Sequence, residues 1–268
     1  MPELPEVEYF MQYIRSTSLH QKIKAVHVKS AQMLLEVTVE EFERLLNAKE
    51  FFGCQRHGKY LFTEVQSDLW LVLHFGMTGN LKYFKATENE PPYTRLLFSF
   101  VNGFSLALTD QRKFGKISVT KGPWEFVRQK NLGPDALQLD FPSFKALVAK
   151  SSGAIKGALL DQHRIAGLGN IYADEILFQT CIHPCAKTCE LDEQTVRQLF
   201  RNMKRILKTA IKHNADIADF PRNWLLHNRV KGRKCPKCPG RIVTLKVAGR
   251  TAYFCPSCQK MPQSRRII

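Results

Sequence analysis

Two stretches that are separated by sixteen residues decide how the end of the chain folds, Cys235-Pro236-Lys237-Cys238 and Cys255-Pro256-Ser257-Cys258. Two CxxC pairs at this spacing are typical of a tetrahedral four-cysteine zinc site. The intervening sequence predicts two strands, Arg241–Val247 and Thr251–Phe254, joined at a basic tip, Ala248-Gly249-Arg250. So small a module has too little core to fold without the metal. We therefore predict one structural Zn²⁺, bound by Cys235, Cys238, Cys255 and Cys258, that holds a β-hairpin.

The other cysteines do not repeat this pattern. A redox CxxC pair is the alternative for the finger, but two such pairs in a basic segment do not resemble a thioredoxin-type site. A second cluster contains Cys181, His183, Cys185 and Cys189. Pro184 interrupts it and no further cysteine pair follows, so structural thiols are favoured over a second metal site. Cys54 is expected in the core.

The basic charge is concentrated at the C-terminal end. The 268-residue chain has a formal net charge of +16, and residues 221–268 contain twelve Lys and Arg but no Asp or Glu. A solvated basic face is the simplest alternative, but acidic residues usually interrupt such faces. The distribution therefore favours contact with a polyanion, and nucleic acid in particular.

No membrane segment is expected. The start of the chain is acidic and contains prolines, unlike a signal peptide. The longest apolar run, Leu69–Phe75, is far shorter than the 18 or so residues that span a bilayer and reads as a strand. We expect a cytoplasmic protein, associated with the nucleoid if the source is bacterial. In such a compartment cysteines are thiols or metal ligands rather than disulfides.

The middle of the chain reads as helical. The character of the sequence changes near Leu132-Gly133-Pro134. Helices are predicted at residues 142–150, 154–161, 171–181 and 192–213. The last has an apolar stripe from Val196 to Ile211 at helical spacing. Between two of these helices, Ile165–Tyr172 contains two glycines that suit a tight turn. Asn170 is the predicted N-cap, and the free amides there could hold a phosphate.

The N-terminal half reads as strand-rich. Short strands are predicted at Ile23–Val28, Tyr60–Val65, Leu69–Phe75, Leu81–Phe84, Arg95–Val101, Phe104–Thr109 and Lys116–Val119. Such short, closely spaced strands favour an antiparallel sandwich or barrel. Thr38 and Glu41 form a predicted capping box for a helix that ends at Leu46.

The chain starts Met1-Pro2-Glu3-Leu4-Pro5-Glu6-Val7-Glu8. Removal of Met1 would leave a proline amine with carboxylates at Glu3 and Glu6. With a reference pKa near 8, roughly a quarter of such amines are unprotonated near pH 7.5, far more than for lysine. A secondary amine of this kind can form an iminium with an electrophilic carbon. The alternative is an ordinary amphipathic helix start, in which an apolar face from Val7 to Ile14 packs on a core.

Several motifs occur together in a recognisable order. They are MPELPEVE at residues 1–8, HFGMTG at residues 74–79, DQRKFG at residues 110–115, GLGNIYADE at residues 167–175, and the four-cysteine finger. In this order they are similar to the formamidopyrimidine-DNA glycosylase family, also called Fpg or MutM, over nearly the whole chain. The related endonuclease VIII branch usually begins MPEGPE, so Leu4 favours the Fpg branch.

This resemblance implies an α+β fold in three parts. The first is an N-terminal catalytic antiparallel β-sandwich with flanking helices at residues 1–132. The second is a central DNA-binding helix–two-turn–helix domain at residues 133–228, and the third is a four-cysteine zinc finger at residues 229–268. The partner implied is damaged double-stranded DNA, bound by a monomer.

The resemblance also implies a bifunctional repair enzyme that excises oxidised bases, namely formamidopyrimidines, 8-oxoguanine and oxidised pyrimidines. Pro2 would attack C1′ of the damaged nucleotide, and Glu3 would protonate the deoxyribose ring oxygen. Glu6 would orient the base or relay protons. The Schiff base would then permit β- and δ-elimination, which cleaves the strand (AP lyase activity). Neither a redox cofactor nor a catalytic metal is implied.

DNA contacts are implied at further positions. Phosphate contacts would come from Lys59, His74, Lys156, Asn170 and Arg250. The space left by a flipped base must be filled, and the matching residues are Met77, Arg112 and Phe114. Without the resemblance, Met77 and Phe114 would more often be core residues, and Lys59 an ordinary solvated lysine.

Two departures from the family pattern stand out. Typical Fpg proteins have a long glycine-containing loop that closes over flipped 8-oxoguanine, whereas Asn214–Val230 is short and lacks glycine. Lys113 replaces a common arginine and loses its bidentate fork. Two other functions remain open. One is an inactive damaged-DNA-binding protein of the same fold, and the other is an N-terminal-proline enzyme for small carbonyl compounds.

Overall fold

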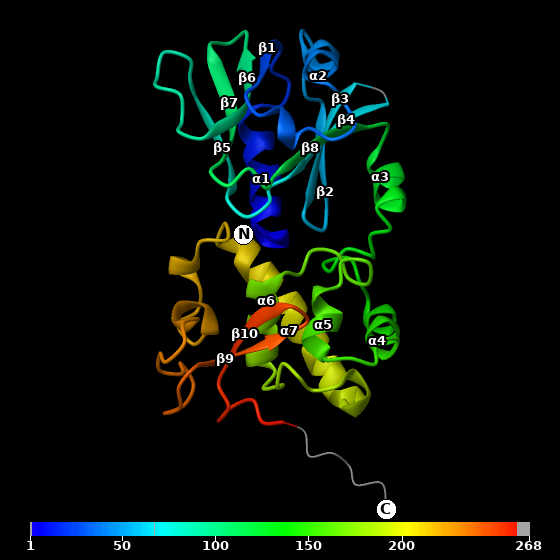
Figure 1. The fold of residues 1–268 in the computed structure, drawn as a ribbon, viewed down its shortest axis with the longest axis vertical. Coiled ribbons are helices and arrows are strands. Elements are labelled where there is room, and N and C mark those ends of the chain that lie inside the picture. The colour runs from blue at the N-terminus through cyan, green and yellow to red at the C-terminus, as the bar shows by residue number, and fades with distance from the viewer. Residues whose placement is uncertain (1, 67, 262–268) are drawn as a thin grey trace, which may run out of the picture. The chain divides into compact units, whose positions relative to one another are not determined.

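A computed structural model describes residues 2–66 and 68–261 (Figure 1). The chain divides into two compact units. The first contains Met1–Pro2 and Glu6–Asn131, and the second contains Glu3–Pro5 and Leu132–Ile268. The three residues Glu3–Pro5 thus belong structurally with the C-terminal half, although they lie at the opposite end of the sequence.

Two four-stranded antiparallel sheets form the first unit. In order across the first sheet, the strands are β1 (Ile23–Val28), β6 (Thr94–Phe100), β7 (Phe104–Asp110) and β5 (Gly79–Lys85). In the second they are β2 (Gly53–His57), β3 (Tyr60–Gln66), β4 (Leu69–His74) and β8 (Lys116–Thr120). The predicted antiparallel sandwich is therefore confirmed.

The core of this unit lies between the sheets and helix α1 (Leu4–Thr17). Alternate residues of β6 are buried, as the period of two in a half-buried strand requires. On α1, the predicted apolar residues from Val7 to Ile14 join the same cluster. The Phe10 ring centroid lies 4.4 Å from that of Phe75. The predicted amphipathic helix at the N-terminus is therefore confirmed. Because α1 begins at Leu4, Pro2 lies before the helix, so the helix does not exclude a reactive amine at Pro2.

Short elements account for the differences from prediction in this unit. Strand β2 and helix α3 (Pro123–Gln129) were not expected. Both are short, and β2 has one fully buried residue, Cys54, so neither has enough periodicity to be recognised. Helix α2 (Val39–Leu46) begins as predicted, because Thr38 Oγ1 accepts a hydrogen bond of 3.2 Å from the Glu41 amide.

The second unit begins with four helices, α4 (Phe141–Ala149), α5 (Ile155–Leu160), α6 (Asn170–Gln179) and α7 (Glu193–Lys212). The apolar stripe of α7 is buried against the others. Leu4 is fully buried in this same core, and its amide donates to the Gly167 carbonyl at 3.1 Å. Among the described residues, no helix combines the length and the apolar character needed to cross a membrane.

The segment after α7 packs closely on these helices. It contains two short 3₁₀ turns, η3 (Ile217–Asp219) and η4 (Leu225–Asn228). Phe220 and Trp224 are buried, with ring centroids 4.9 Å apart. The Glu175 carboxylate of α6 accepts hydrogen bonds from the Leu226 amide at 3.0 Å and from Gln179 at 2.7 Å. The hairpin of β9 (Val243–Val247) and β10 (Arg250–Phe254) follows.

Glu175 should make the stability depend on pH. Burial raises the pKa of this carboxyl from 4.5 to about 7, against the opposing effect of its hydrogen bonds. Between about pH 4.5 and 7 the folded protein therefore keeps a proton that the unfolded chain has released. Stability from this group is thus lost as pH rises through this window. Glu175→Gln stays neutral, so its free energy of unfolding should match the parent near pH 4.5 and exceed it by up to about 3 kcal/mol at pH 8.

Chemical denaturation at several pH values measures this difference. Glu88→Gln is the matched control, because it removes the same charge from an exposed side chain. Parallel pH profiles for the parent and Glu175→Gln would contradict the prediction.

Candidate active site and nucleic-acid interface

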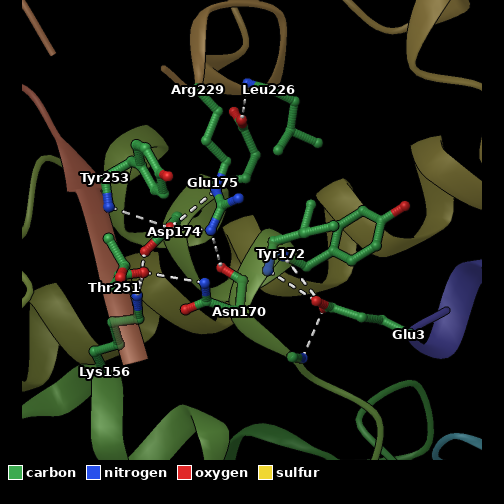
Figure 2. Close-up of polar contacts among 12 residues, drawn as sticks. Glu3, Lys156, Asn170, Tyr172, Asp174, Glu175, Leu226, Arg229, Thr251 and Tyr253 are labelled. Atoms are coloured by element: carbon green, nitrogen blue, oxygen red, sulfur yellow. Dashed lines mark hydrogen bonds and ion pairs between the residues drawn. The ribbon is translucent and has the colours of Figure 1, made fainter. Parts of the chain in front are cut away.

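A buried carboxylate occupies the N-terminus of α6. Glu3 is fully buried, and its side chain points at the first amides of this helix (Figure 2). One oxygen, Oε2, accepts from the Gly169 amide at 2.7 Å and from the Tyr172 amide at 3.3 Å. The other, Oε1, accepts from the Ile171 amide at 2.8 Å. The positive end of the helix dipole lies at the same place, so it adds to the stabilisation of the negative charge.

This arrangement corrects the prediction for Asn170. The N-cap is Gly169, which has no capping side chain, and Asn170 is the first helical residue. The capping oxygen atoms come instead from Glu3, which is 166 residues away from Gly169 in the chain. The amides that seemed available for a phosphate are thus occupied by a carboxylate. A Cβ at position 169 would collide with Glu3, which explains the glycine.

The catalytic candidates lie on both sides of this carboxylate in the sequence. Pro2 is half-buried and directly precedes Glu3 in the chain. Glu6 is half-buried in the first turn of α1. Lys59 follows Gly58, which has a positive φ of 56° in the turn between β2 and β3. A carboxylate beside a secondary amine can exchange protons with it.

His74 lies at the end of β4 and is neutral in the physiological range. Burial, together with a smaller effect of the positive charge of Lys59, lowers its pKa from 6.5 to about 4. Its Nδ1 atom accepts a 3.3 Å hydrogen bond from the Gly76 amide. A neutral imidazole that accepts at Nδ1 carries its hydrogen on Nε2. His74 therefore offers a hydrogen-bond donor without a positive charge.

The three predicted void-filling residues are exposed. Met77 retains 38% of its surface and Phe114 retains 50%, unusual values for large apolar side chains. The Arg112 guanidinium lies 4.7 Å from the Phe114 ring centroid. Lys113, between them, has a positive φ of 56°. Met77 lies in the loop between β4 and β5, and Arg112 and Phe114 lie in the loop between β7 and β8. Both loops thus present these side chains to solvent rather than to the core.

One buried acid, Asp110, holds these two loops together. It bonds to the Thr78 hydroxyl, next to Met77, and accepts from the amides of Arg112 at 3.2 Å and Gly115 at 2.7 Å. Asp110 is the first residue of the DQRKFG motif, and no role was predicted for it. An aspartate directly before an exposed loop is a known turn signal, because its oxygens accept from amides a few residues later.

Lys156 is not presented to solvent, contrary to what a phosphate contact requires. Its side chain is fully buried, and Nζ donates to Asp174 at 2.6 Å and to the Thr251 carbonyl at 3.1 Å (Figure 2). Burial lowers the pKa of the Lys156 ammonium, and the Asp174 carboxylate opposes that shift. Neither Asp174 nor Arg229, its other ionic partner, was predicted as a site residue. An acid on an otherwise apolar, buried helix is the signal that could have found them.

Arg250 is exposed at the start of β10. The predicted three-residue tip is shorter in the structure, where Ala248 and Gly249 form the turn with positive φ values of 48° and 72°. Two consecutive residues with positive φ are the pattern of a tight two-residue hairpin turn. Arg250 is therefore held by the strand rather than by the loop.

The finger cysteines form the predicted metal site. Their four Sγ atoms all lie within 4.8 Å of one another. The Cys235–Cys258 and Cys238–Cys255 sulfur pairs are 3.7 and 3.6 Å apart. A tetrahedral zinc with bonds of about 2.3 Å separates its sulfurs by about 3.8 Å, so these cysteines fit one Zn²⁺. The Lys237 and Gly240 amides donate to the Cys235 and Cys238 sulfurs at 3.4 Å, which stabilises thiolates.

The remaining cysteines behave differently. Within residues 2–66 and 68–261, only the finger cysteines bring three or more potential metal-ligating side chains together. Cys181 and Cys189 are exposed and Cys185 is half-buried. Cys54 is buried in the sandwich core as predicted, and burial raises its pKa to about 11, so it stays a thiol.

Three family models match consecutive parts of the chain. They are the formamidopyrimidine-DNA glycosylase N-terminal domain at residues 1–117, the formamidopyrimidine-DNA glycosylase H2TH domain at residues 132–221, and the zinc finger found in FPG and IleRS at residues 232–260. This succession of domains is that of a zinc-finger DNA glycosylase, the class of enzyme to which the fold and the cysteine site also point.

Individual relatives agree with this class over their full length. The chain is 34% identical over 282 residues to the formamidopyrimidine-DNA glycosylase of Synechocystis, covering 97% of this chain and 98% of the relative. Lactococcus lactis Fpg in complex with DNA containing an abasic site is similar in structure, with a TM-score of 0.87, 31% identity and coverage of 97% and 100%. MutM in complex with DNA containing carbocyclic 8-oxo-G gives the same values. The chain belongs to the formamidopyrimidine-DNA glycosylase family, as predicted.

Loss of one zinc ligand should release the metal and unfold the hairpin. Cys255 is fully buried, and its replacement by serine leaves three thiolates around the ion. We expect Cys255→Ser to lose its zinc and to bind DNA at least tenfold more weakly, because the metal supplies the folding energy of the module. Mass spectrometry under native conditions measures the zinc. Cys189→Ser is the control and should keep one zinc per chain. One tightly bound zinc in Cys255→Ser would show that the site is assigned wrongly.

Proposed function

We propose that this glycosylase excises oxidised bases from duplex DNA through a Schiff base at Pro2 and then cleaves the strand. The observation that supports this most directly is the Glu3 carboxylate, which three backbone amides hold in place beside Pro2 in the chain. Met1 lies outside the described residues. The proposal requires its removal, because an amide nitrogen at Pro2 would have no lone pair for attack.

The first step is a proton transfer between these neighbours. Near neutral pH most N-terminal amines are ammonium ions, whereas a carboxylate that accepts amide hydrogen bonds favours its ionised form. Transfer of one proton from Pro2 to Glu3 makes the amine a nucleophile and the carboxyl an acid at once. The nitrogen then bonds to C1′ as the glycosidic bond breaks, and the departing base takes up the proton that the nitrogen loses. The Glu3 proton passes to the ring oxygen as the bond from C1′ to that oxygen breaks, and the nitrogen lone pair forms the C=N bond of an iminium ion.

Strand cleavage follows from the same intermediate. The iminium ion withdraws electrons, so a proton at C2′ becomes acidic and its loss expels the 3′ phosphate. A second elimination expels the 5′ phosphate, and hydrolysis of the Schiff base frees Pro2. Glu6 is proposed to orient the base or relay protons, and Lys59 to contact the phosphate beside the lesion. The other proposed contacts are His74, Asn170 and Arg250 to phosphates, and Met77, Arg112 and Phe114 to the vacated stack.

The partner we propose is damaged double-stranded DNA, which the protein binds as a monomer. We propose a cytoplasmic location, with association to the nucleoid if the source is bacterial. The proposed division is a catalytic domain at residues 1–132, a helix–two-turn–helix domain at residues 133–228 and a finger at residues 229–268. The exposed Phe114 and Met77 support the insertion of side chains into a base stack. The neutral His74 supports a hydrogen bond to DNA that is largely independent of salt.

The lesion preference is proposed from the segment between α7 and the finger. Phe220 and Trp224 anchor it in the helical core, and Glu175 fixes its backbone at Leu226. A segment tied down in this way has little freedom to close over a flipped base. We therefore propose that formamidopyrimidines and oxidised pyrimidines are excised at least as fast as 8-oxoguanine.

Borohydride trapping tests the nucleophile. The protein with Met1 removed should form a covalent adduct with a lesion duplex in the presence of borohydride, at the mass of protein plus cleaved DNA. The matched control is the same chain with Met1 retained, which differs only in the state of the Pro2 nitrogen. It should bind the duplex within about threefold and form no adduct. Failure of the processed protein to form an adduct would favour the alternative of an inactive damaged-DNA-binding protein.

Single-turnover excision rates test the lesion preference. Matched duplexes should carry a formamidopyrimidine, an oxidised pyrimidine or 8-oxoguanine at the same position. The first two should react at least as fast as the third, because no mobile cap is available to favour 8-oxoguanine. A tenfold or greater advantage for 8-oxoguanine would contradict the proposal without affecting the Schiff-base chemistry.

A further inference from the structure

Asp174, in the second turn of α6, gathers partners from three separate segments. Its Oδ1 atom accepts from Lys156 Nζ of α5 at 2.6 Å. Its Oδ2 atom accepts from the Arg229 guanidinium at 2.8 and 3.0 Å and from the Tyr253 amide of β10 at 3.2 Å (Figure 2). Asp174 is 1% exposed and Lys156 is fully buried. A buried ionic group with this many bonds fixes the geometry of every segment that it contacts.

The same cluster reaches β10 at a second point. Lys156 Nζ donates to the Thr251 carbonyl at 3.1 Å, and Asn170 Nδ2 donates to the same oxygen at 3.0 Å. The Arg229 guanidinium lies 4.4 Å from the Tyr253 ring centroid. Strand β10 is therefore attached to α5 and α6 at Thr251 and Tyr253, directly after Arg250.

Lys156 has no route to a phosphate in this arrangement. A contact with DNA would first require the ammonium to leave Asp174 and Thr251, and Asp174 would then keep one of its two cationic partners, Arg229. Truncating or removing one partner of a buried ion pair is costly, because the other charge stays buried without its counterion. The charge of Lys156 is thus already neutralised within the protein.

We propose that Asp174 and Lys156 are positioning residues, which hold Arg250 and Asn170 at a fixed separation for gripping the DNA backbone. Lys156 acts through Asp174 and Thr251 rather than by touching phosphate. An acidic residue thereby increases the affinity of a basic protein for DNA. The inference rests on the proposed function only in that Arg250 and Asn170 contact phosphate, and binding rather than catalysis is its readout, so it survives if Pro2 is not the nucleophile.

Asp174→Asn is the sharpest test, because geometry and charge predict opposite results. Removal of a negative charge from a DNA-binding protein should strengthen binding by electrostatics alone. The amide keeps the size of the side chain, but its NH₂ group is a donor and cannot accept the hydrogen bonds that one carboxylate oxygen of Asp174 accepts. We expect the dissociation constant for a lesion duplex to rise at least tenfold. Equal or tighter binding would overturn the proposal.

The salt dependence distinguishes a positioning lysine from a phosphate contact. Each phosphate contact contributes about 0.9 to the slope of log K against log salt concentration. Arg250→Gln should lower the magnitude of this slope by about one. Lys156→Gln should weaken binding at least fivefold and leave the slope within about 0.3 of the parent. A loss of slope equal to that of Arg250→Gln would make Lys156 a direct contact and overturn the proposal.

The same samples are checked for folding, so that weaker binding is not caused by unfolded protein. Binding is measured on full-length protein well below the melting temperature of each variant, with one zinc per chain confirmed. A role in stability alone would lower the melting temperature and leave the affinity of the folded variant unchanged, which would also overturn the proposal. If Asp174→Asn does not fold, the slope and affinity of Lys156→Gln decide.

Discussion

The hydrogen bonds between the Glu3 carboxylate and the first amides of α6 are the constraint on which the site depends. A buried carboxylate is costly unless it is hydrogen-bonded, and three amides at the positive end of a helix meet that need. Gly169 makes the approach possible, since any side chain there would meet Glu3. The segment Glu3–Pro5 is thereby built into the helical unit. Pro2 is bonded to Glu3, so one end of this residue is attached to a segment whose position is fixed.

Two further acids make α6 the element on which the second unit is organised. Asp174 bonds to α5, to Arg229 and to β10, and Glu175 bonds to the segment that follows α7. All three acids are essentially inaccessible to solvent. One short helix thus sets the position of the N-terminal segment, the zinc hairpin and the segment between them. Packing alone would leave these segments free to slide, because apolar contacts carry little directional information.

What the sequence predicted correctly is local or periodic. The stripe of α7 and the two CxxC pairs contain their own spacing, so the helix and the zinc site followed from neighbouring residues. The errors concern contacts over long sequence distances. Asn170 has the right residue type for an N-cap, but Glu3 took that role from the far end of the chain. Lys156 reads as a surface residue because lysine is rarely buried, and only the position of Asp174 shows why it is.

The placement of these acids also fits a chain with a net charge of +16. Carboxylates exposed near DNA would repel phosphates, whereas each of these three is masked. Amides and a helix dipole face Glu3, two cations face Asp174, and burial raises the pKa of Glu175 to about 7, so that it is largely protonated below neutral pH. Negative groups can therefore fix the geometry of a DNA-binding surface without lowering its attraction for DNA. A cation could not take the place of Glu3 at the start of α6, because backbone amides donate hydrogen bonds and need acceptors at a helix N-terminus.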